Sequence, residues 1–209
     1  MKTLFIEAKS KAIVNKLKIL ELSKALPVSL AIAYSIQFKD IAKEIGNILS
    51  ESHEITQLIQ VLGCSKPVFS KNTQAILLIG QGRFHAISLA YETKLPVFML
   101  NKDRLEKISE KDLELIEKKQ KISYLKFLNE DKIGILISTK PGQNRLKKAI
   151  ELQNKLKDKK SYLFLANNIN PLEFQNFGLS SWVNTACSRL DMVNNSIINI
   201  SRFDNSLSN

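Results

Sequence analysis

Two segments of the chain combine glycine with basic and amide side chains directly after a strand-like run. The first run, residues 75–79, is followed by Gly80, Gln81, Gly82, Arg83, Phe84 and His85. The second run, residues 133–138, leads to Gly142, Gln143, Asn144 and Arg145. Glycine permits a tight turn and close approach of a ligand to the backbone, and arginine offers a planar fork to a carboxylate. A strand that ends in such a turn and opens a helix is a typical anion-binding place.

Neither turn is specific by itself. The first is equally well an ordinary turn in which Arg83 pairs with a surface carboxylate. His85 is then either a proton carrier or a hydrogen-bonding residue at a helix start. The second turn lacks the second glycine and the Lys-Ser/Thr pair of a Walker A loop. It is either a cradle of backbone N–H groups and the Gln143 amide for a carboxylate or ribose, or a simple helix start.

The two cysteines, Cys64 and Cys187, each follow an apolar, strand-like run. Such a cysteine is often a small buried apolar residue, and the alternative is thiolate ligation of a soft metal centre. Neither belongs to a CxxC pair, so the sequence shows no self-contained zinc site. Two thiolates are too few for a cubane iron–sulfur cluster, which therefore requires a further ligand. Arg189 follows Cys187 closely and is either a charge beside such a cluster or a surface arginine.

The net charge of +11 indicates either an anionic partner or a lysine-rich solvated surface. Aromatic residues make up only 7% of the chain and are not interleaved with the basic ones, which argues against a stacking platform for single-stranded nucleic acid. No apolar run reaches the roughly 18 residues of a membrane span, and the first eleven residues do not resemble a signal peptide. We therefore expect a cytoplasmic protein without a structural disulfide.

The alternation of strand-like and helix-like segments predicts an α/β protein with two similar parallel-sheet domains in tandem, of Rossmann or flavodoxin-like type. Residues 28–121 would form the domain with Cys64, and residues 122–209 the domain with Cys187. Residues 1–27 would form a strand and a helix ahead of these two domains. The strands are expected at residues 4–8, 28–36, 55–62, 75–79, 96–100, 133–138, 162–166, 182–186 and 197–200.

Helices are predicted between these strands by their apolar spacing. A charged helix over residues 103–121 would connect the two series, with Ser109 and Asp112 as a possible local helix start within it. Residues 124–128 are either a short strand or a continuation of that helix. The remaining helices are expected at residues 12–25, 38–49, from 84 onward, 143–157 and 172–177.

The ordered set of these motifs resembles the archaeal diphthamide synthase family. The resemblance rests on Leu62-Gly63-Cys64, the Gly80–His85 turn, the Gly142–Arg145 turn and the stretch Trp182-Val183-Asn184-Thr185-Ala186-Cys187-Ser188-Arg189, with Gln37-Phe38 also similar. It implies a dimer of chains with three α/β domains, each of which gives one cysteine to a 4Fe-4S cluster. That cluster reductively cleaves S-adenosylmethionine to a 3-amino-3-carboxypropyl radical. The radical is added to a histidine of translation elongation factor 2, the first step of diphthamide synthesis.

The resemblance implies that Cys64 and Cys187 are ligands of the cluster. The residues that match cleft motifs and are expected to bind the cofactor are Arg83, His85, Gly142, Gln143, Arg145 and Arg189. The chain begins where the family's first domain ends, so the resemblance implies that residues 1–27 join a missing first domain. We therefore expect the third ligand to come from a first-domain polypeptide or a dimer partner. Neither a membrane nor direct nucleic-acid contact is expected.

The chain departs from the family pattern at two places. Ser188 stands where the family usually has proline, and the acidic pair that follows is reduced to Asp191 with Asn194 and Asn195. The alternative function is therefore a non-catalytic accessory subunit that binds the synthase or elongation factor 2. A third possibility is an unrelated anion-binding α/β module.

Overall fold

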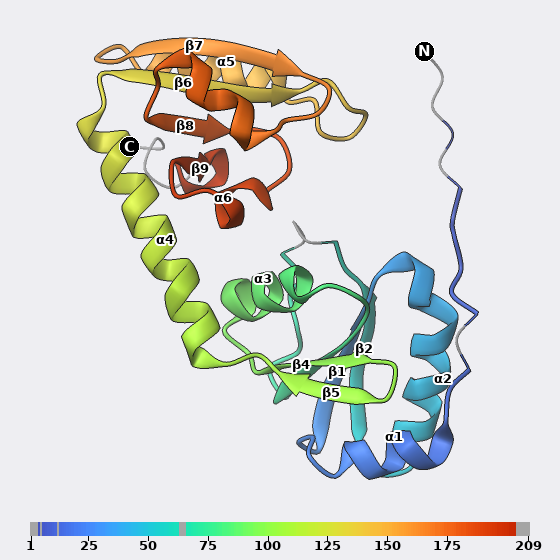
Figure 1. Cartoon of the computed structure of the whole chain (residues 1–209). Coiled ribbons are helices and arrows are strands. Elements are labelled where there is room, and N and C mark those ends of the chain that lie inside the picture. Colours follow the sequence, from blue (N-terminus) through green and yellow to red (C-terminus); the bar gives the residue numbers. More distant parts are fainter. Residues whose placement is uncertain (1–3, 5, 12, 63–65, 204–209) are drawn as a thin grey trace. The chain divides into compact units, whose positions relative to one another are not determined.

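The computed structural model describes residues 4, 6–11, 13–62 and 66–203. The chain divides into unit 1, Met1–Leu113, and unit 2, Glu114–Asn209 (Figure 1). The division falls inside the long charged helix α4 (Glu110–Asn129). In the described part of the chain, no helix is both long and apolar enough to cross a membrane.

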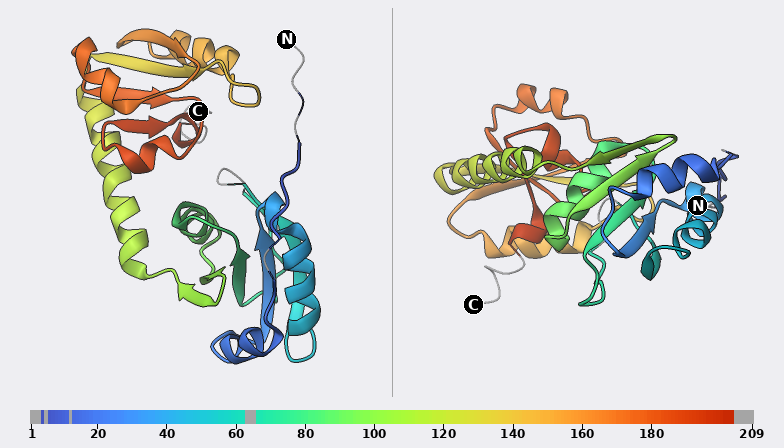
Figure 2. Two further views of the ribbon diagram at one scale, coloured as in Figure 1. Left: turned by 45° about the vertical axis from the view of Figure 1, so that its right-hand side comes forward. Right: turned by 90° about the horizontal axis from the view of Figure 1, so that it is seen from below.

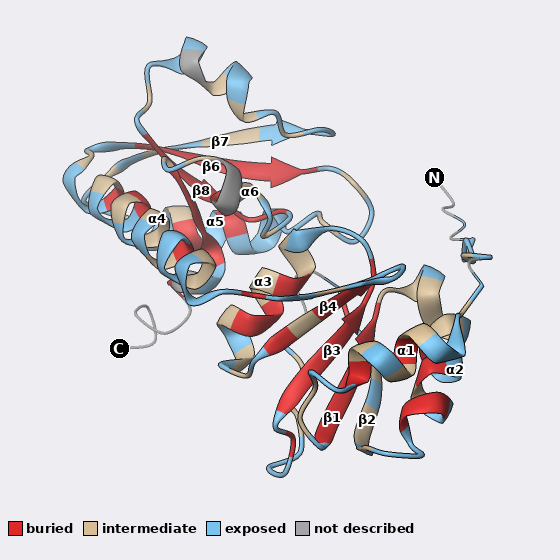
Figure 3. Ribbon diagram, turned by 60° about the horizontal axis from the view of Figure 1, so that its bottom comes forward, coloured by how far each residue is buried: buried red, intermediate tan, exposed pale blue. Residues whose placement is uncertain are grey.

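Unit 1 is built on one five-stranded sheet with the order β2-β1-β3-β4-β5. Its parallel strands are β1 (Ser29–Tyr34), β2 (Glu54–Gln60), β3 (Ala75–Ile79) and β4 (Val97–Asn101). Every residue of β1 and β3 is buried (Figure 3), which explains their continuous apolar sequence, because helices cover both faces of a central parallel strand. Strand β5 (Arg104–Lys107) turns back antiparallel to β4 and closes one edge with charged residues.

Different helices cover the two faces of the unit 1 sheet (Figure 2). On one face, α1 (Lys16–Ser23) and α2 (Lys39–Leu49) pack Ile19 and Ile45 against Ile32 and Leu77. On the other face, α3 (Arg83–Thr93) packs residues such as Ala86, Leu89 and Ala90 against Ala31 and Leu78. A short 3-10 turn, η1 (Ile36–Phe38), links β1 to α2.

Unit 2 repeats the arrangement with a four-stranded, all-parallel sheet in the order β7-β6-β8-β9. The strands are β6 (Lys132–Ser138), β7 (Lys160–Ala166), β8 (Ser181–Asn184) and β9 (Ile197–Asn199). The connecting elements are α5 (Leu146–Lys155), η2 (Pro171–Phe177), α6 (Leu190–Val193) and the terminal η3 (Ile200–Arg202). In both sheets the first strand lies between the second and the third, which is the flavodoxin-like order. The prediction of two similar parallel-sheet α/β units is confirmed.

One close approach inside unit 2 depends on glycine. Gly134 on β6 is paired in register with Trp182 on β8, and a Cβ atom at Gly134 would overlap the indole ring. The ring is 2% exposed and packs on Phe164 and Phe174, with ring centroids 4.9 and 4.6 Å away. Gly134 therefore makes room for the largest side chain of this core.

The structure differs from the sequence prediction in several elements. Residues 4 and 6–8 are not in a strand, and the first helix begins only at Lys16, where the Asn15 side chain accepts a hydrogen bond from the Lys18 N–H. Residues 104–107, predicted as helix, form β5, because pairing with β4 overrides the weak helical pattern of a short charged segment. Residues 124–128 continue α4, and β8 ends at Asn184, two residues earlier than predicted.

Candidate functional site

The two units present their loops in equivalent ways at the carboxyl ends of their strands. In each sheet the first and third strands are neighbours, and the chain leaves their carboxyl ends toward opposite faces of the sheet. Doubly wound folds bind ligands at the point where two neighbouring strands diverge in this way. In unit 1 the third strand, β3, leads into the Gly80–Arg83 turn. In unit 2 the third strand, β8, leads into the turn that carries Cys187. The glycine turn and the cysteine turn therefore occupy corresponding places in their own sheets.

The turn after β8 is held by two buried asparagines. The Asn184 Oδ1 atom accepts a hydrogen bond from the Ala186 N–H at 2.9 Å, and its Nδ2 atom donates to the Cys187 carbonyl at 2.8 Å. The Asn199 Nδ2 atom, from the end of β9, donates to the Ser188 carbonyl at 2.9 Å. The Asn184 amide also donates to the Asn199 amide oxygen, so the two side chains form one network. This pair, Asn184 and Asn199, is referred to below as the amide clamp.

Thr185 fastens the base of the same turn to the central strand. Its N–H and its hydroxyl both donate to the Leu136 carbonyl, at 3.0 and 2.8 Å. Thr185 is fully buried, whereas the free thiol of Cys187 is exposed. The turn thus ties its backbone to the protein interior and leaves the sulfur accessible.

The hydroxyl group of Ser188, the residue after Cys187, indicates whether a cofactor could bind at the Cys187 thiol. The Ser188 Oγ atom is buried and has no hydrogen-bond partner in the described part of the chain. A buried polar atom without a partner is uncommon in native proteins and calls for an explanation such as an absent ion or cofactor. An exposed thiol, followed in sequence by a serine with an unpartnered hydroxyl, fits one corner of an iron–sulfur cluster, whose sulfurs accept hydrogen bonds.

The sequence offered two interpretations of Arg83, and the structure pairs it with carboxylates. Its Nε atom lies 3.0 Å from Glu106 Oε1 on β5, and its Nη2 atom lies 2.8 Å from Asp112 Oδ2. All three residues belong to unit 1. Arg83 therefore connects the start of α3 to β5 and to the first turn of α4.

The predicted helix start at Ser109 and Asp112 is confirmed. The Asp112 N–H donates to Ser109 Oγ, and the Asp112 carboxylate accepts from the Ser109 N–H and hydroxyl, the latter at 2.6 Å. This reciprocal pattern is a capping box, in which Ser109 directly precedes α4 and Asp112 is its third residue. The hydrogen bonds from Ser109, followed by the positive charge of Arg83, hold the pKa of Asp112 below its ordinary value.

The glycine turn itself has the geometry that its sequence predicts. Gly82 has a φ of +93° and directly precedes α3, a conformation that other residues rarely adopt. The His85 N–H donates to the Gly82 carbonyl at 3.3 Å, and the half-buried His85 ring meets the Phe84 ring edge to face. His85 is thus part of the first turn of α3.

The second basic turn, between β6 and α5, is more exposed. Gly142 has a φ of +78°, and a Cβ atom there would meet nothing within 4 Å. The Gln143 N–H donates to the Lys140 carbonyl, and the Asn144 side chain accepts from the Leu146 N–H. Arg145, which directly precedes α5, is exposed. The turn therefore offers an exposed arginine and an open face to a ligand.

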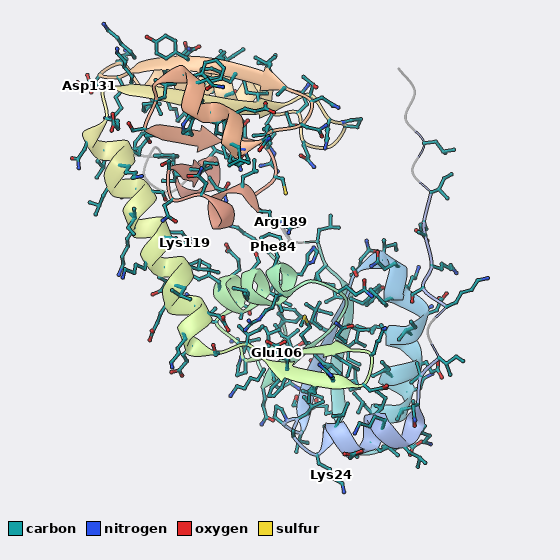
Figure 4. All side chains as sticks on the ribbon, viewed as in Figure 1. Lys24, Phe84, Glu106, Lys119, Asp131 and Arg189 are labelled. Atoms are coloured by element: carbon teal, nitrogen blue, oxygen red, sulfur yellow. The ribbon has the colours of Figure 1, made fainter. Side chains whose placement is uncertain are left out.

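The remaining predicted site residues are Arg189 and Cys64. Arg189 is exposed and lies directly before α6 (Figure 4). Cys64 lies outside the described residues, in the connection between β2 and β3. Among the described residues, no three His, Cys, Asp or Glu side chains gather as a metal site. Because Cys64 is not among the described residues, Cys187 carries the only thiol in the described part of the chain.

Sequence reasoning missed some of the residues that shape these turns. Asn199 was not singled out, because it lies twelve residues after Cys187 in sequence and reaches the turn only through the pairing of β8 with β9. Asp112 was recognised as a helix start but not as the partner of Arg83. A Ser-x-x-Asp pattern at the start of a charged helix indicates the cap, and only the fold brings the arginine to it.

The fold and the turns together define a tandem of flavodoxin-like units, one of which presents an exposed thiol after a central strand. Comparison with known proteins narrows this class. The family described as "Putative diphthamide synthesis protein" matches residues 1–205. The chain therefore belongs to the diphthamide synthesis family, and the resemblance noted in the sequence is confirmed.

Individual relatives agree with this assignment. The 2-(3-amino-3-carboxypropyl)histidine synthase of Methanocaldococcus jannaschii is 30% identical over 204 residues, which cover 91% of this chain and 56% of the relative. The protein of the same name from Pyrococcus horikoshii is 30% identical over 135 residues, or 64% of this chain and 39% of the relative. The chain thus spans little more than half the length of the first of these relatives.

Solved structures share the fold. The crystal structure of Dph2 from Pyrococcus horikoshii with a 4Fe-4S cluster matches with a TM-score of 0.75 and 24% identity, covering 90% of this chain and 60% of that one. A second crystal structure of the same protein matches equally well, with a TM-score of 0.75. The fold of this chain is therefore the fold of the matched part of Dph2.

Proposed function

We propose that this chain takes part in the first step of diphthamide biosynthesis, in the cytoplasm. The reaction is transfer of a 3-amino-3-carboxypropyl group from S-adenosylmethionine to a histidine of translation elongation factor 2. The observation that carries the proposal is the exposed Cys187 thiol, fixed by the amide clamp after β8, in a chain of this family. The curated relatives bear the name of the corresponding synthase.

The proposed cofactor is a 4Fe-4S cluster. We assign Cys187 and Cys64 as two of its ligands, and the third comes from outside these two cysteines, from a first-domain segment or a dimer partner. When bound, such a cluster supplies the electron that cleaves S-adenosylmethionine to the radical that is transferred. The exposed thiol and the unpartnered Ser188 hydroxyl support this assignment.

The basic turns are assigned to S-adenosylmethionine. The open face of the Gly142–Gln143 turn suits backbone and amide contacts to the substrate, and Arg145 and Arg189 suit its carboxylate, because a guanidinium binds a carboxylate with two parallel hydrogen bonds. His85 is retained as a candidate contact. Arg83 is already paired with Glu106 and Asp112. Its proposed contribution is to hold the glycine turn in place.

The decisive experiment is anaerobic reconstitution with iron and sulfide. The chain would be tested alone and with a co-expressed first domain that carries a cysteine. We expect oxygen-sensitive visible absorbance only in the second sample, and its loss in both Cys187→Ala and Cys64→Ala. Asn168→Ala, which changes an exposed residue of unit 2, is the matched control. If the supplemented sample binds no iron, the enzymatic proposal fails.

The second candidate function is a non-catalytic accessory subunit that binds the synthase or elongation factor 2. The net charge of +11 favours it, because a basic surface attracts an acidic partner. Affinity purification at low salt would recover either protein with this chain. Recovery of neither one would remove this candidate.

A further inference from the structure

The four edge strands of the two sheets differ in how they are protected from pairing with another chain. Strand β5 has four residues, three of them charged, and β9 has three residues, all of them buried. Strand β2 pairs with β1 in an irregular register, and the loop before β3 covers it, with the Ser70 N–H donating to the Gln57 side chain. Short, charged, irregular or covered edges prevent unwanted strand pairing. Three of the four edges therefore carry such a protection.

The fourth edge strand, β7, is long, regular and apolar. Its seven residues pair with β6 in unbroken register, and its only charged residue is Lys160, at the first position. Every residue of β7 is exposed or half-buried, in contrast to the neighbouring β6 (Figure 3). The side chains of Tyr162 and Leu165 are 46% and 55% exposed. An edge of this kind is a template on which another strand can pair.

The backbone groups needed for such pairing point away from the sheet. The Lys160 N–H donates to the Asp131 carbonyl, at the start of β6. Because alternate residues of a parallel strand bond to the same neighbour, Leu163 and Leu165 direct their N–H and C=O groups away from β6. Among the described residues, no strand pairs with β7 on that side. Leu163 and Leu165 therefore offer two donors and two acceptors to an added strand.

Apolar side chains flank both faces of the β7 edge. On one face, the Gln153 side chain of α5 donates to a β7 carbonyl at 2.9 Å, which places this side of α5 over β7. Leu146 and Ile150 lie on the same side of α5 and are 37% and 41% exposed. On the other face, Phe164 of β7 meets the exposed ring of Phe177 from η2, with ring centroids 4.7 Å apart. An added strand would bury its alternate side chains against apolar surface on both faces.

The positive charge of unit 2 is concentrated around the same edge. Residues 140–160, which form the turn before α5, α5 itself and the turn into β7, contain eight Lys or Arg residues and two acidic ones. The remainder of unit 2 contains seven of each. Arg145, Lys157 and Lys160 are exposed. Pairing of β7 with a second copy would bring two basic segments together, so repulsion disfavours self-pairing and favours an acidic partner.

We propose that β7 binds an extended, acidic segment of another protein as an additional strand of the unit 2 sheet. Main-chain hydrogen bonds to Leu163 and Leu165 hold the segment, as in other cases of strand addition. Its apolar side chains pack beside Tyr162 on one face and Leu165 on the other. Acidic residues at its ends meet Arg145 and Lys157. Neither proposed function gives this edge a role.

The test is calorimetric titration of the full chain, as purified, with a nine-residue peptide that has alternating valine and threonine at its centre and two glutamates at each end. We expect this peptide to bind. A version with N-methylated central amides, which cannot form the ladder, should bind at least ten-fold more weakly. A version with lysines in place of the glutamates should also bind at least ten-fold more weakly. No binding at millimolar peptide, or equal affinity for all three peptides, would overturn the proposal.

Variants locate the site. Leu165→Glu adds a negative charge to the edge, and Leu165→Pro removes an N–H that β6 does not use, so each should weaken peptide binding at least ten-fold. Leu125→Glu is the matched control, because Leu125 is a similarly exposed leucine of α4, at 57%, and it should leave affinity unchanged. The fluorescence of Trp182 checks that each variant is folded.

Hydrogen exchange gives a local measurement, in which the bound peptide should slow exchange of the Leu163 and Leu165 amides. Unchanged affinity in both Leu165 variants would place binding elsewhere and refute the proposal. A dimer of the peptide-free chain that Leu165→Glu dissociates would show a second copy on the edge and would refute it as well. None of these measurements needs iron, so the outcome is separate from that of the reconstitution.

Discussion

Replacement of Asn184 by alanine tests whether the amide clamp holds the Cys187 turn. The Asn184 side chain makes three hydrogen bonds, to the Ala186 N–H, the Cys187 carbonyl and the Asn199 amide oxygen. Asn184 is 1% exposed, Ala186 8% and Asn199 7%, so water has little access to the groups left behind. The carbonyl of exposed Cys187 is the one of the three that solvent can recover.

The expected loss of unfolding free energy in Asn184→Ala follows from the two hydrogen-bonding partners that stay buried. Leaving a buried donor or acceptor unsatisfied costs about 1–3 kcal/mol, so the Ala186 N–H and the Asn199 oxygen together predict a loss of roughly 2–6 kcal/mol. A typical domain has only about 5–15 kcal/mol of stability, so the loss would be large. Asn168→Ala, at an exposed position, should change stability by less than about 0.5 kcal/mol.

The assay is urea unfolding followed by the fluorescence of Trp182, the single tryptophan, which reports on unit 2. Amide hydrogen exchange adds a local measurement. Leu152→Ala, which truncates a buried side chain of α5, should lower stability by a comparable amount of about 2–5 kcal/mol without changing the turn. Only Asn184→Ala should release the Ala186 amide beyond the change in global stability. If both variants expose that amide equally, or if Asn184→Ala unfolds at the same urea concentration as the unchanged chain, the reasoning is refuted.

Three further predictions concern other contacts. Gly134→Ala should destabilise unit 2 by about 1–3 kcal/mol or more in the same urea assay, because the new methyl group would overlap Trp182. Gly46 lies on helix α2, and a Cβ atom there would lie 3.4 Å from Ile32 Cδ1 on β1, so Gly46→Ala should instead gain up to about 0.5–1 kcal/mol of stability. Destabilisation by this substitution would contradict the packing described. The pKa of Asp112 is lower in the folded state than its unfolded value of about 3.9. The ionised carboxylate therefore stabilises the folded state at a pH above the unfolded pKa. This contribution is lost as the pH falls through the lower, folded pKa. Unfolding curves between pH 5 and 2 should therefore show a shallower acid dependence for Asp112→Asn than for the unchanged chain, and parallel curves would count against it.

The amino-acid sequence by itself determined the α/β class, the two strand–helix series and the family. Continuous apolar runs such as residues 75–79 are typical of strands buried on both faces, and the glycines at 82 and 142 mark turns with positive φ. The spacing of Ser109 and Asp112 was enough to locate a helix start, because a capping box is a local interaction.

What the sequence left open was decided by contacts between residues distant in the chain. Arg83 could bind a ligand or a carboxylate, and the choice came from β5 and α4, which bring Glu106 and Asp112 to it. Likewise, the role of Asn199 arises only when β9 pairs with β8. Local patterns determine elements because helices and turns are formed by near neighbours, whereas the partner of a charged or amide side chain depends on sheet order, which is a property of the whole fold.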